Sequence, residues 1–325
     1  MADIPDRLAA ALASQYRLER QIGAGAMATV YLAHDLKHHR EVAIKVLKPQ
    51  LTATLAGERF LREVEFSARL THPHILGLFD SGRADGFLYY VMPYVEGETL
   101  RDRLERGDPM PVAEACHILR DVADALAYAH RHHVVHRDVK PANILLADGH
   151  AMVMDFGVAK AVTDAAEGDE SRSRLTTPGT TVGTPAYMAP EQAAADPDID
   201  ARADLYAFGV VAYEIFSGRP PFAATTTQQM VAAHVTRAPE PLASRRSGLP
   251  PAVEALVMQC LEKDPARRPH DAGALLPVLE AVATGAPVPS AARPASRRTR
   301  GWIAVGVTAV LVVAIAIVYF ATRTP

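Results

Sequence analysis

A polar run near the middle of the chain has the residue types that phosphoryl transfer requires. It reads His136-Arg137-Asp138-Val139-Lys140-Pro141-Ala142-Asn143. Transfer of a phosphoryl group to a hydroxyl needs an acceptor for the hydroxyl proton, oxygen ligands for magnesium and a cation near the developing charge. Asp138 can accept the proton, Asn143 can bind the metal, and Lys140 can approach the γ-phosphate. The run therefore predicts a phosphotransferase site.

A second acidic string follows at a distance that suits the same site. Asp155-Phe156-Gly157 comes twelve residues after Asn143, directly after the apolar run AMVM. Asp155 would be a second hard oxygen ligand at a strand end, as magnesium prefers. Two such strings at this separation rarely arise by coincidence, so we expect both residues to be magnesium ligands.

Two features upstream could hold the phosphates of a nucleotide. A run of small residues between two strand-like segments would let backbone N–H groups approach phosphate oxygens. Its members are Ile22, Gly23, Ala24, Gly25, Ala26, Met27, Ala28, Thr29 and Val30. Lys45 closes the apolar run Val42-Ala43-Ile44 and could bind the α and β phosphates, held by an acid from the following helix. Glu63 is the acid that we expect, with Glu58 and Glu65 as neighbouring candidates.

Each of these upstream features also has a simpler interpretation. The small-residue run could be a tight Gly/Ala hairpin without a ligand, and Lys45 could be a solvated strand end. A dinucleotide-binding fingerprint is disfavoured, because a strand and not a helix follows the run.

The elements that would position these residues change character along the chain. Up to Val95, short runs rich in Val, Ile, Leu and Tyr indicate strands, interrupted by one helical stretch over 57–70. The strand runs are YRLERQIG, ATVYLAHD, EVAIKVL, ILGLFDSG and FLYYVMPYV. Later residues follow a helical pattern, with helices expected over 113–131, 204–217 and 251–263. The sequence thus predicts a small β-rich lobe and a large α-rich lobe that meet near Pro93–Gly97.

Together, the motifs GAGAMATV, VAIK, HRDVKPAN, DFG and APE resemble the signature set of the eukaryotic-type protein kinases. Their order and spacing match over 16–283, and details such as YVMPYVEGETL resemble the bacterial branch, whose members often carry one transmembrane helix. The resemblance implies an α+β, bilobal protein-kinase fold with an N-lobe over about 16–95 and a C-lobe over about 96–283. It implies a serine/threonine protein kinase that uses ATP and Mg²⁺, which Mn²⁺ could replace, and acts on protein substrates.

Family roles transfer to individual positions around the nucleotide. Met92 matches the gatekeeper, and Pro93-Tyr94-Val95 matches the hinge whose backbone binds adenine, with Val30 and Ala43 on the two sides of the base. Two positions depart from the pattern. The third glycine of the loop is Ala28, which still leaves room for phosphate. Pro93 lacks an N–H, but the adenine contact there uses its carbonyl. Neither departure indicates an inactive enzyme.

Other matched positions are structural. His136 matches a packing residue of the catalytic turn, and Asp204 matches the helix acid that braces the backbone of this turn. Arg268 matches the arginine that pairs with Glu191, within Ala189-Pro190-Glu191.

The segment that follows Asp155 would be an activation loop. Within it, Thr184 matches the threonine that contacts the catalytic Asp138 and the lysine two residues later in serine/threonine kinases. Arg137 precedes the catalytic aspartate, the pattern of kinases that are switched on by loop phosphorylation. We expect autophosphorylation first at Thr176 or Thr177, and then at Thr180 or Thr181. The simpler interpretation is that these are solvated loop hydroxyls.

The C-terminal part predicts a membrane anchor. Residues 301–321 read GWIAVGVTAVLVVAIAIVYFA, and from Trp302 onward they hold no charge over the length that a helix needs to cross a bilayer. The preceding stretch 284–300 is rich in Pro, Ala and Arg, as expected of a juxtamembrane linker, and 322–325 would be a short external tail. Arginines are concentrated before the span, which predicts a single-pass plasma-membrane protein with a cytoplasmic kinase domain.

The charge distribution of the chain indicates which kinds of partner are unsuitable. The net charge is −3, yet from Thr284 onward there are five arginines and no acid, so the body of the chain is acidic. An acidic body argues against nucleic acid as a partner. Residues 1–15 would be an N-terminal extension without a signal-peptide pattern. Cys116 and Cys260 are expected to be buried thiols.

Three alternatives stand beside the kinase hypothesis, one of which, a pure membrane adaptor, would explain the C-terminal segment but none of the residues of the predicted site. A pseudokinase scaffold would bind nucleotide and partners without catalysis, but Lys45, Asp138, Asn143 and Asp155 are all intact. A small-molecule phosphotransferase would not explain the threonine-rich loop. A metal site in the histidine run His130, His132, His133 and His136 is disfavoured, because this spacing does not bring the rings to one face.

A homodimer of the kinase could carry out autophosphorylation in trans.

Overall fold

The structure is a computed structural model, and it describes residues 6–52, 57–158, 185–196 and 198–287. The chain divides into two compact units, Met1–Val288 and Pro289–Pro325. Within the described ranges, no helix combines the length and the apolar character needed to cross a membrane. The predicted transmembrane segment 301–321 and tail 322–325 lie outside these ranges, as does most of the predicted linker.

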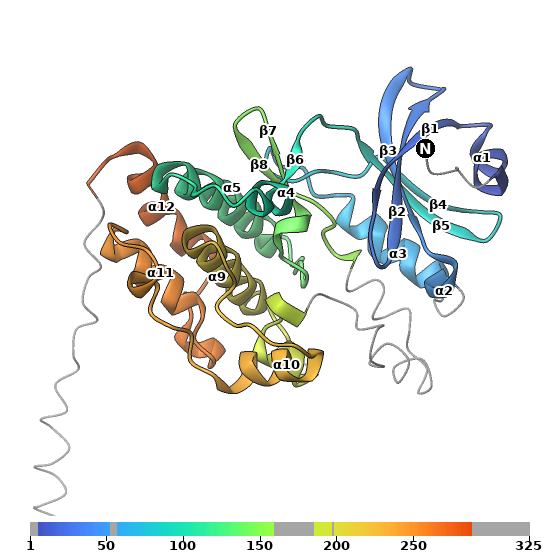
Figure 1. The fold of residues 1–325 in the computed structure, drawn as a ribbon. Helices are drawn as coiled ribbons and strands as arrows, with labels where there is room; N and C mark the ends of the chain where they lie inside the picture. Colours follow the sequence, from blue (N-terminus) through green and yellow to red (C-terminus); the bar gives the residue numbers. More distant parts are fainter. Residues whose placement is uncertain (1–5, 53–56, 159–184, 197, 288–325) are drawn as a thin grey trace, which may run out of the picture. The chain divides into compact units, whose positions relative to one another are not determined.

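A five-stranded antiparallel sheet forms the N-terminal lobe (Figure 1). In spatial order its strands are β1 (Tyr16–Ala24), β2 (Ala28–Asp35), β3 (Arg40–Leu47), β5 (Phe87–Pro93) and β4 (Asp80–Ala84). Helix α3 (Gly57–Ser67) contacts β4 and buries Phe60 and Val64. Its apolar residues recur with helical spacing, so one face is covered while the charged face stays in solvent.

One predicted strand was wrong over most of its length. The run ILGLFDSG becomes β4 only from Asp80, and the preceding residues leave the sheet. Ile75 forms an isolated bridge with Val153 of the C-terminal lobe, and the Leu76 N–H donates to the Val153 carbonyl at 3.0 Å. Because these backbone groups find partners in the other lobe, the apolar run connects the lobes instead of adding to the sheet.

The N-terminal extension is part of the N-lobe core. Residues Asp6–Leu12 form helix α1, which contacts β1 and β4. Leu8 and Leu12 are buried in the same apolar cluster as Tyr16 and Tyr31. The short helix α2 (Pro49–Thr52) follows β3.

The C-terminal lobe is mainly helical. Its helices are α4 (Leu100–Glu105), α5 (Val112–Arg131), α8 (Pro190–Ala193), α9 (Arg202–Ser217), α10 (Thr227–Thr236), α11 (Pro251–Cys260) and α12 (Leu276–Thr284). A small sheet pairs β6 (Glu98–Thr99), β7 (Ile144–Ala147) and β8 (His150–Val153) in that order. Short 3-10 helices lie at Pro141–Asn143, Pro185–Tyr187, Leu242–Ser244, Pro265–Arg267 and Ala272–Leu275. The strongly helical pattern predicted after Gly97 is therefore present.

Helix α9 is the centre of this lobe. Every residue from Ala203 to Phe216 is buried, including the charged residues Asp204 and Glu214, so the helix is enclosed on all sides. Gly209 allows α11 to approach closely, because a Cβ there would lie 2.7 Å from the Cβ of Cys260. Cys260 and Cys116 are both free and buried, as expected from the sequence.

Helix α11 ends earlier than predicted, at Cys260 instead of residue 263. The carbonyls of Glu262 and Lys263 accept hydrogen bonds from the Arg268 guanidinium, at 2.9 and 3.2 Å. These side-chain bonds replace the helical ones, and Pro265 could not have continued the helix in any case.

A buried histidine makes the C-lobe core sensitive to mild acid. The hydroxyl of Tyr206 accepts a hydrogen bond from the Lys263 ammonium at 3.0 Å, so its own proton is directed to Nδ1 of His234, also at 3.0 Å. Protonation of Nδ1 would remove this acceptor and place a second cation beside Lys263. Burial, and then the Lys263 charge, lower the pKa of His234 to about 4.

We predict that stability falls between about pH 6.5 and pH 4 because of His234. In this range the unfolded chain binds a proton at His234 that the folded chain does not, so the free energy of unfolding decreases as the pH falls. The shift from 6.5 to about 4 corresponds to roughly 3 kcal/mol. Urea unfolding at several pH values gives the free energy of unfolding as a function of pH. Between about pH 6.5 and pH 4 this free energy should depend less steeply on pH in His234→Gln than in the wild type. The matched substitution His270→Gln, at an exposed position, should leave the slope unchanged; equal slopes in all three proteins would contradict the prediction.

Candidate active site

A buried carboxylate holds the turn that carries the predicted catalytic residues. Asp204, in the first turn of α9, accepts hydrogen bonds from the backbone N–H groups of His136 and Arg137, each at 2.8 Å. His130, near the end of α5, donates from Nε2 to the same carboxylate at 2.8 Å. Burial by itself would raise the pKa of Asp204, but the bonds from His130 and the His136 backbone hold it below the ordinary value.

The His136 side chain fixes the same turn from the other side. Its Nε2 lies 2.8 Å from the carbonyl of Met154, which can only accept, so Nε2 carries the proton. Its Nδ1 then accepts from the backbone N–H of Asp138 at 3.2 Å. The ring meets Phe156 edge-on, with centroids 4.6 Å apart. His136 therefore links the catalytic turn to the Asp155-Phe156-Gly157 segment.

Two of the predicted catalytic residues, Asp138 and Lys140, lie in contact, together with the predicted metal ligand Asn143. Lys140 Nζ donates to Oδ2 of Asp138 at 2.7 Å, and the Asn143 amide nitrogen donates to the same oxygen at 3.1 Å. The amide nitrogen also binds the backbone carbonyl of Asp138, at 2.9 Å. Asn143 thus uses its nitrogen to orient Asp138, which leaves its amide oxygen for a hard cation.

Lys45 is bound to Asp155 across the interface between the lobes. Its ammonium contacts Oδ2 of the carboxylate, and the hydroxyl of Tyr90 donates to Oδ1 at 2.7 Å. Lys45 and Tyr90 are cross-strand partners in β3 and β5, so the sheet register delivers both donors to one point. Burial would raise the pKa of Asp155, but Lys45 and Tyr90 lower it overall, which keeps the carboxylate ionised.

Tyr90 is a site residue that the sequence analysis missed. It lies inside an apolar strand run, FLYYVMP, where an aromatic residue indicates core packing. Its hydroxyl partner is sixty-five residues away, so no local pattern indicates the bond.

The apolar members of the predicted nucleotide-binding set pack together. Ile22, Val30, Ala43, Met92 and Val95 belong to a single apolar cluster. Two methionines from the C-lobe side, Met152 and Met154, pack against the same cluster and were not predicted. Apolar walls of this kind suit the faces of a planar base.

The small-residue run is a tight hairpin between β1 and β2. The Gly25 N–H donates to the Ala28 carbonyl at 2.8 Å, and residues Ala24 to Ala26 at the tip are exposed. Ala28, which replaces the third glycine of the motif, is only 3% exposed and packs in the apolar cluster. Its methyl group therefore does not occupy the exposed tip, where phosphates would bind.

Glu63 is the most suitable of the three candidate acids on α3. It is half-buried, whereas Glu58 and Glu65 are exposed. The α3 segment around it lies against the Asp155-Phe156-Gly157 turn, because a Cβ on Gly157 would clash with the hydroxyl of Ser67 and lie 4.0 Å from the Glu63 carbonyl. Lys45 itself forms an ion pair with Asp155.

Glu191 and Arg268 also come together as expected from the family pattern. Two guanidinium nitrogens of Arg268 bind the two carboxylate oxygens of Glu191, at 2.5 and 2.8 Å. The next residue, Gln192, donates to the carbonyl of Arg137 at 2.9 Å. The segment around Glu191 is therefore fixed to the catalytic turn and to the region after α11.

The predicted phosphorylation sites lie outside the described residues; they are Thr176, Thr177, Thr180 and Thr181. Thr184, the predicted contact of Asp138, also lies outside them. Within the histidine run, His130 and His136 hold the contacts given above, and Nδ1 of His132 lies 2.9 Å from the Tyr128 carbonyl.

These observations define the class of the protein. The β-rich lobe contributes a hairpin of small residues and a lysine, and the helical lobe contributes Asp138, Lys140, Asn143 and Asp155. These are the parts of a nucleotide-dependent phosphotransferase. The family model "Protein kinase domain" matches residues 16–276. The chain belongs to the protein kinase family.

Its relatives are kinases of the serine/threonine class. The chain is 39% identical over 282 residues to the serine/threonine-protein kinase PknB of Mycobacterium leprae, an alignment covering 85% of this chain and 44% of the relative. PknD of Mycobacterium tuberculosis is also 39% identical, over 263 residues that cover 80% of this chain and 38% of the relative. The chain thus spans less than half the length of these relatives. The domain is of the serine/threonine protein kinase type, as the sequence predicted.

We predict that Tyr90→Phe destabilises the protein through the lost bond to Asp155. The ring stays in the core, so only a hydrogen bond to a charged group is removed, which is worth about 1.5–3 kcal/mol. Urea unfolding followed by circular dichroism would measure this difference.

The matched control is Tyr31→Phe on strand β2, where the tyrosine is also buried but its hydroxyl has no hydrogen bond within the described residues. This variant should lie within about 0.5 kcal/mol of the wild type. Similar losses for both variants would mean that the Tyr90–Asp155 bond contributes nothing specific.

Proposed function

We propose that the protein transfers the γ-phosphoryl group of ATP to serine or threonine hydroxyls of proteins. The observation that carries this proposal is the contact of Lys140 and Asn143 with one oxygen of Asp138. The carboxylate is thereby oriented and is about one-fifth exposed, so it can accept a proton from an incoming hydroxyl. Lys140 is then placed to balance charge that develops on the transferred group.

Magnesium fits the donor set that the chain offers. Asp155 presents an ionised carboxylate and Asn143 an amide oxygen, both hard ligands. Bound there, Mg²⁺, or Mn²⁺ in its place, would neutralise phosphate charge. The apolar cluster with Val30, Ala43 and Met92 would hold the adenine, and the backbone of Pro93 and Val95 its polar edge. Lys45, supported by Glu63 once the phosphates draw it away from Asp155, would bind the α and β phosphates.

Arg137 supports activation by loop phosphorylation. Its backbone φ is +67°, and its Nε is buried without a hydrogen-bond partner in the described part of the chain. A buried guanidinium nitrogen without an acceptor is unfavourable, and a phosphate oxygen would satisfy it. We propose that phosphorylated Thr176 or Thr177 supplies this phosphate, with Thr180 and Thr181 as further sites, and that a homodimer could carry out the reaction in trans. Thr184 is proposed to contact Asp138.

We also propose that residues 301–321 anchor the protein in the plasma membrane, with the kinase domain in the cytoplasm and 284–300 as the linker. The support is the uncharged run from Trp302 to Ala321, preceded by three closely spaced arginines. On this proposal the kinase acts in membrane-associated signalling.

The second candidate, a pseudokinase scaffold, has less support. It would not require Asp138 to be oriented by two donors, nor Asp155 to remain ionised although it is buried. Both features are unnecessary for nucleotide binding alone.

We predict that Asp138→Asn strongly reduces phosphate transfer. Full-length protein is incubated with Mg²⁺ and radiolabelled ATP, and removal of the proton acceptor should reduce transfer by about 10²–10⁴-fold. Asp148→Asn, the same substitution on the exposed turn between β7 and β8, should be as active as the wild type. Label in active protein should map to Thr176 or Thr177. A folded wild type that binds ATP but transfers nothing would favour the scaffold.

We predict that residues 301–321 cause membrane association. The protein expressed in bacterial cells should stay in the membrane pellet after alkaline carbonate extraction. Val312→Arg together with Val313→Arg places two charges near the centre of the span, each unfavourable by about 3 kcal/mol, and should release it. Thr322→Arg, beyond the span, is the matched control and should remain in the pellet. Retention of all three proteins would contradict the anchor.

A further inference from the structure

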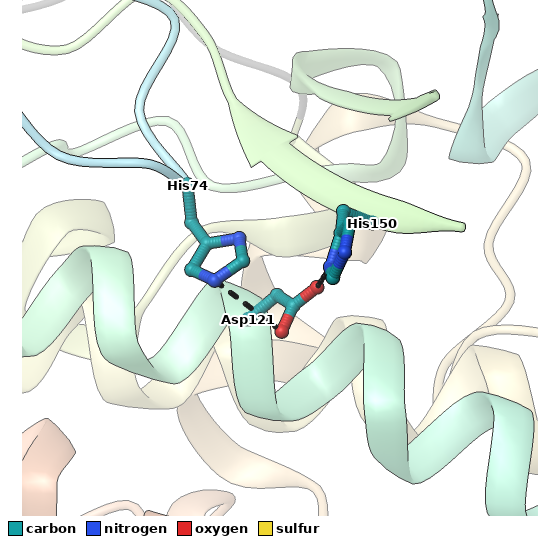
Figure 2. A group of neighbouring side chains, drawn as sticks. All are labelled: His74, Asp121 and His150. Atoms are coloured by element: carbon teal, nitrogen blue, oxygen red, sulfur yellow. Dashed lines mark hydrogen bonds and ion pairs between the residues drawn. The ribbon is translucent and has the colours of Figure 1, made fainter. Parts of the chain in front are cut away.

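A cluster of histidines surrounds a buried aspartate outside the site described above. Figure 2 shows the imidazoles of His74 and His150 on the two sides of the Asp121 carboxylate. His74 comes from the connection after α3, Asp121 from the middle of α5, and His150 from the start of β8. One nitrogen of each ring and one carboxylate oxygen all lie within 4.8 Å of one another.

The spacing of these atoms suits a small cation. His150 Nδ1 lies 3.3 Å from Oδ2 of Asp121, and His74 Nε2 lies 3.6 Å from Oδ1. A fourth group, His117 Nε2, is 3.8 Å from Oδ2. A tetrahedral ion with bonds of about 2.0–2.1 Å holds its ligand atoms roughly 3.3–3.4 Å apart. His74 faces Oδ1, whereas His150 and His117 face Oδ2, so the rings must move closer to one carboxylate oxygen when an ion binds, because separations within the trio reach 4.8 Å.

The tautomer of His74 is fixed in the form that a metal ligand needs. Its Nδ1 lies 3.0 Å from the carbonyl of Ala151, which can only accept, so Nδ1 carries the proton. In the neutral ring the lone pair of Nε2 therefore faces the Asp121 carboxylate, and two acceptors oppose each other. A cation between them removes this repulsion. A histidine that donates its other N–H to a backbone carbonyl is the usual outer-sphere support of a metal-bound imidazole.

The aspartate is prepared for the same role. Its side chain is fully buried, and burial would raise its pKa, but a hydrogen bond from Arg120 and the backbone N–H of Ala151 lower it. The carboxylate is therefore ionised. Arg120 binds Oδ1, at 2.5 and 3.1 Å, and the Ala151 N–H donates to Oδ2 at 3.1 Å, so Oδ2 keeps one further lone pair for an ion on the side of His117 and His150.

We propose that His74, Asp121 and His150 bind a divalent transition-metal ion, with Zn²⁺ as the best match and His117 as the fourth ligand. Imidazole nitrogens with one carboxylate oxygen favour zinc over magnesium or calcium, which prefer oxygen ligands alone. The side chains of His150 and His117 are 57% and 36% exposed, so the ion can enter from solvent. His74 is only 13% exposed and forms, with Asp121, the fixed part of the site.

A bound ion would connect three segments of the domain. The loop after α3 already contacts β8 through the Val153 N–H, which donates to the His74 carbonyl at 2.9 Å. The ion would add side-chain bonds from this loop to α5 and to β8. Its role is therefore structural: it limits movement of the loop that joins α3 to the helical lobe.

The test measures metal binding, independently of phosphate transfer. Full-length protein in detergent, without a histidine tag and stripped with a chelator, is titrated with Zn²⁺ in a calorimeter. One ion per chain should bind with a Kd of about 1 µM or tighter. Co²⁺ should give the visible absorption of a four-coordinate site. His150→Ala and His74→Ala should each weaken binding at least tenfold.

The matched control is His132→Ala, an exposed histidine directly after α5, which should bind Zn²⁺ like the wild type. Saturating Zn²⁺ should also raise Tm by about 5 °C in the wild type and in this control, but not in His150→Ala. Circular dichroism verifies that each variant is folded. Absence of stoichiometric binding by the folded wild type would overturn the proposal. The proposal would also be overturned if His132→Ala weakened Zn²⁺ binding and His150→Ala left it unchanged.

Discussion

The catalytic turn depends on one buried charge, the carboxylate of Asp204. Two consecutive backbone N–H groups, those of His136 and Arg137, donate to this side chain and have no other hydrogen-bond acceptor in the described part of the chain. Arg137 adopts a left-handed backbone conformation that a non-glycine residue rarely adopts. Such a conformation persists only where the surroundings fix it. Because Asp204 lies in the first turn of the fully buried helix α9, the core of the helical lobe determines where Asp138 lies.

Side chains of both lobes contact a second carboxylate or its neighbour, at Asp155 and Phe156. In the N-terminal lobe, Lys45 and Tyr90 bind the Asp155 carboxylate from neighbouring strands, and in the C-terminal lobe the His136 ring contacts the adjacent Phe156. The backbone of Asp155 is also left-handed, at φ +63°. Asp204 and Asp155 are thus joined through His136, which bonds to the carbonyl of Met154 directly before Asp155. The predicted proton acceptor, Asp138, and the predicted metal ligand, Asp155, are therefore positioned by one connected set of hydrogen bonds.

The sequence was sufficient for the residues that lie in short motifs. Asp138, Lys140 and Asn143 fall within one turn, so their spacing alone brings them together, and the two-lobe division follows from the change of period near Gly97. Contacts between distant segments were not predictable in this way. Tyr90 resembles a core aromatic until its partner is known, and Ile75 leaves the sheet because Val153 offers a backbone partner. Helix α1 was missed because seven residues give too short a pattern.

The histidine cluster and the active site occupy the two ends of one short strand. Strand β8 begins at His150 and ends at Val153, and Asp155 follows two residues later. The strand is held on one side by β7 and on the other by the connection after α3, through the bridge between Ile75 and Val153. That connection also ends the helix that carries Glu63. A constraint at His74 and His150 therefore acts on the segments that supply Asp155 and Glu63 without touching either. On the proposal that Lys45 passes from Asp155 to Glu63 when nucleotide binds, the stiffness of this connection would bear on which of the two acids it contacts.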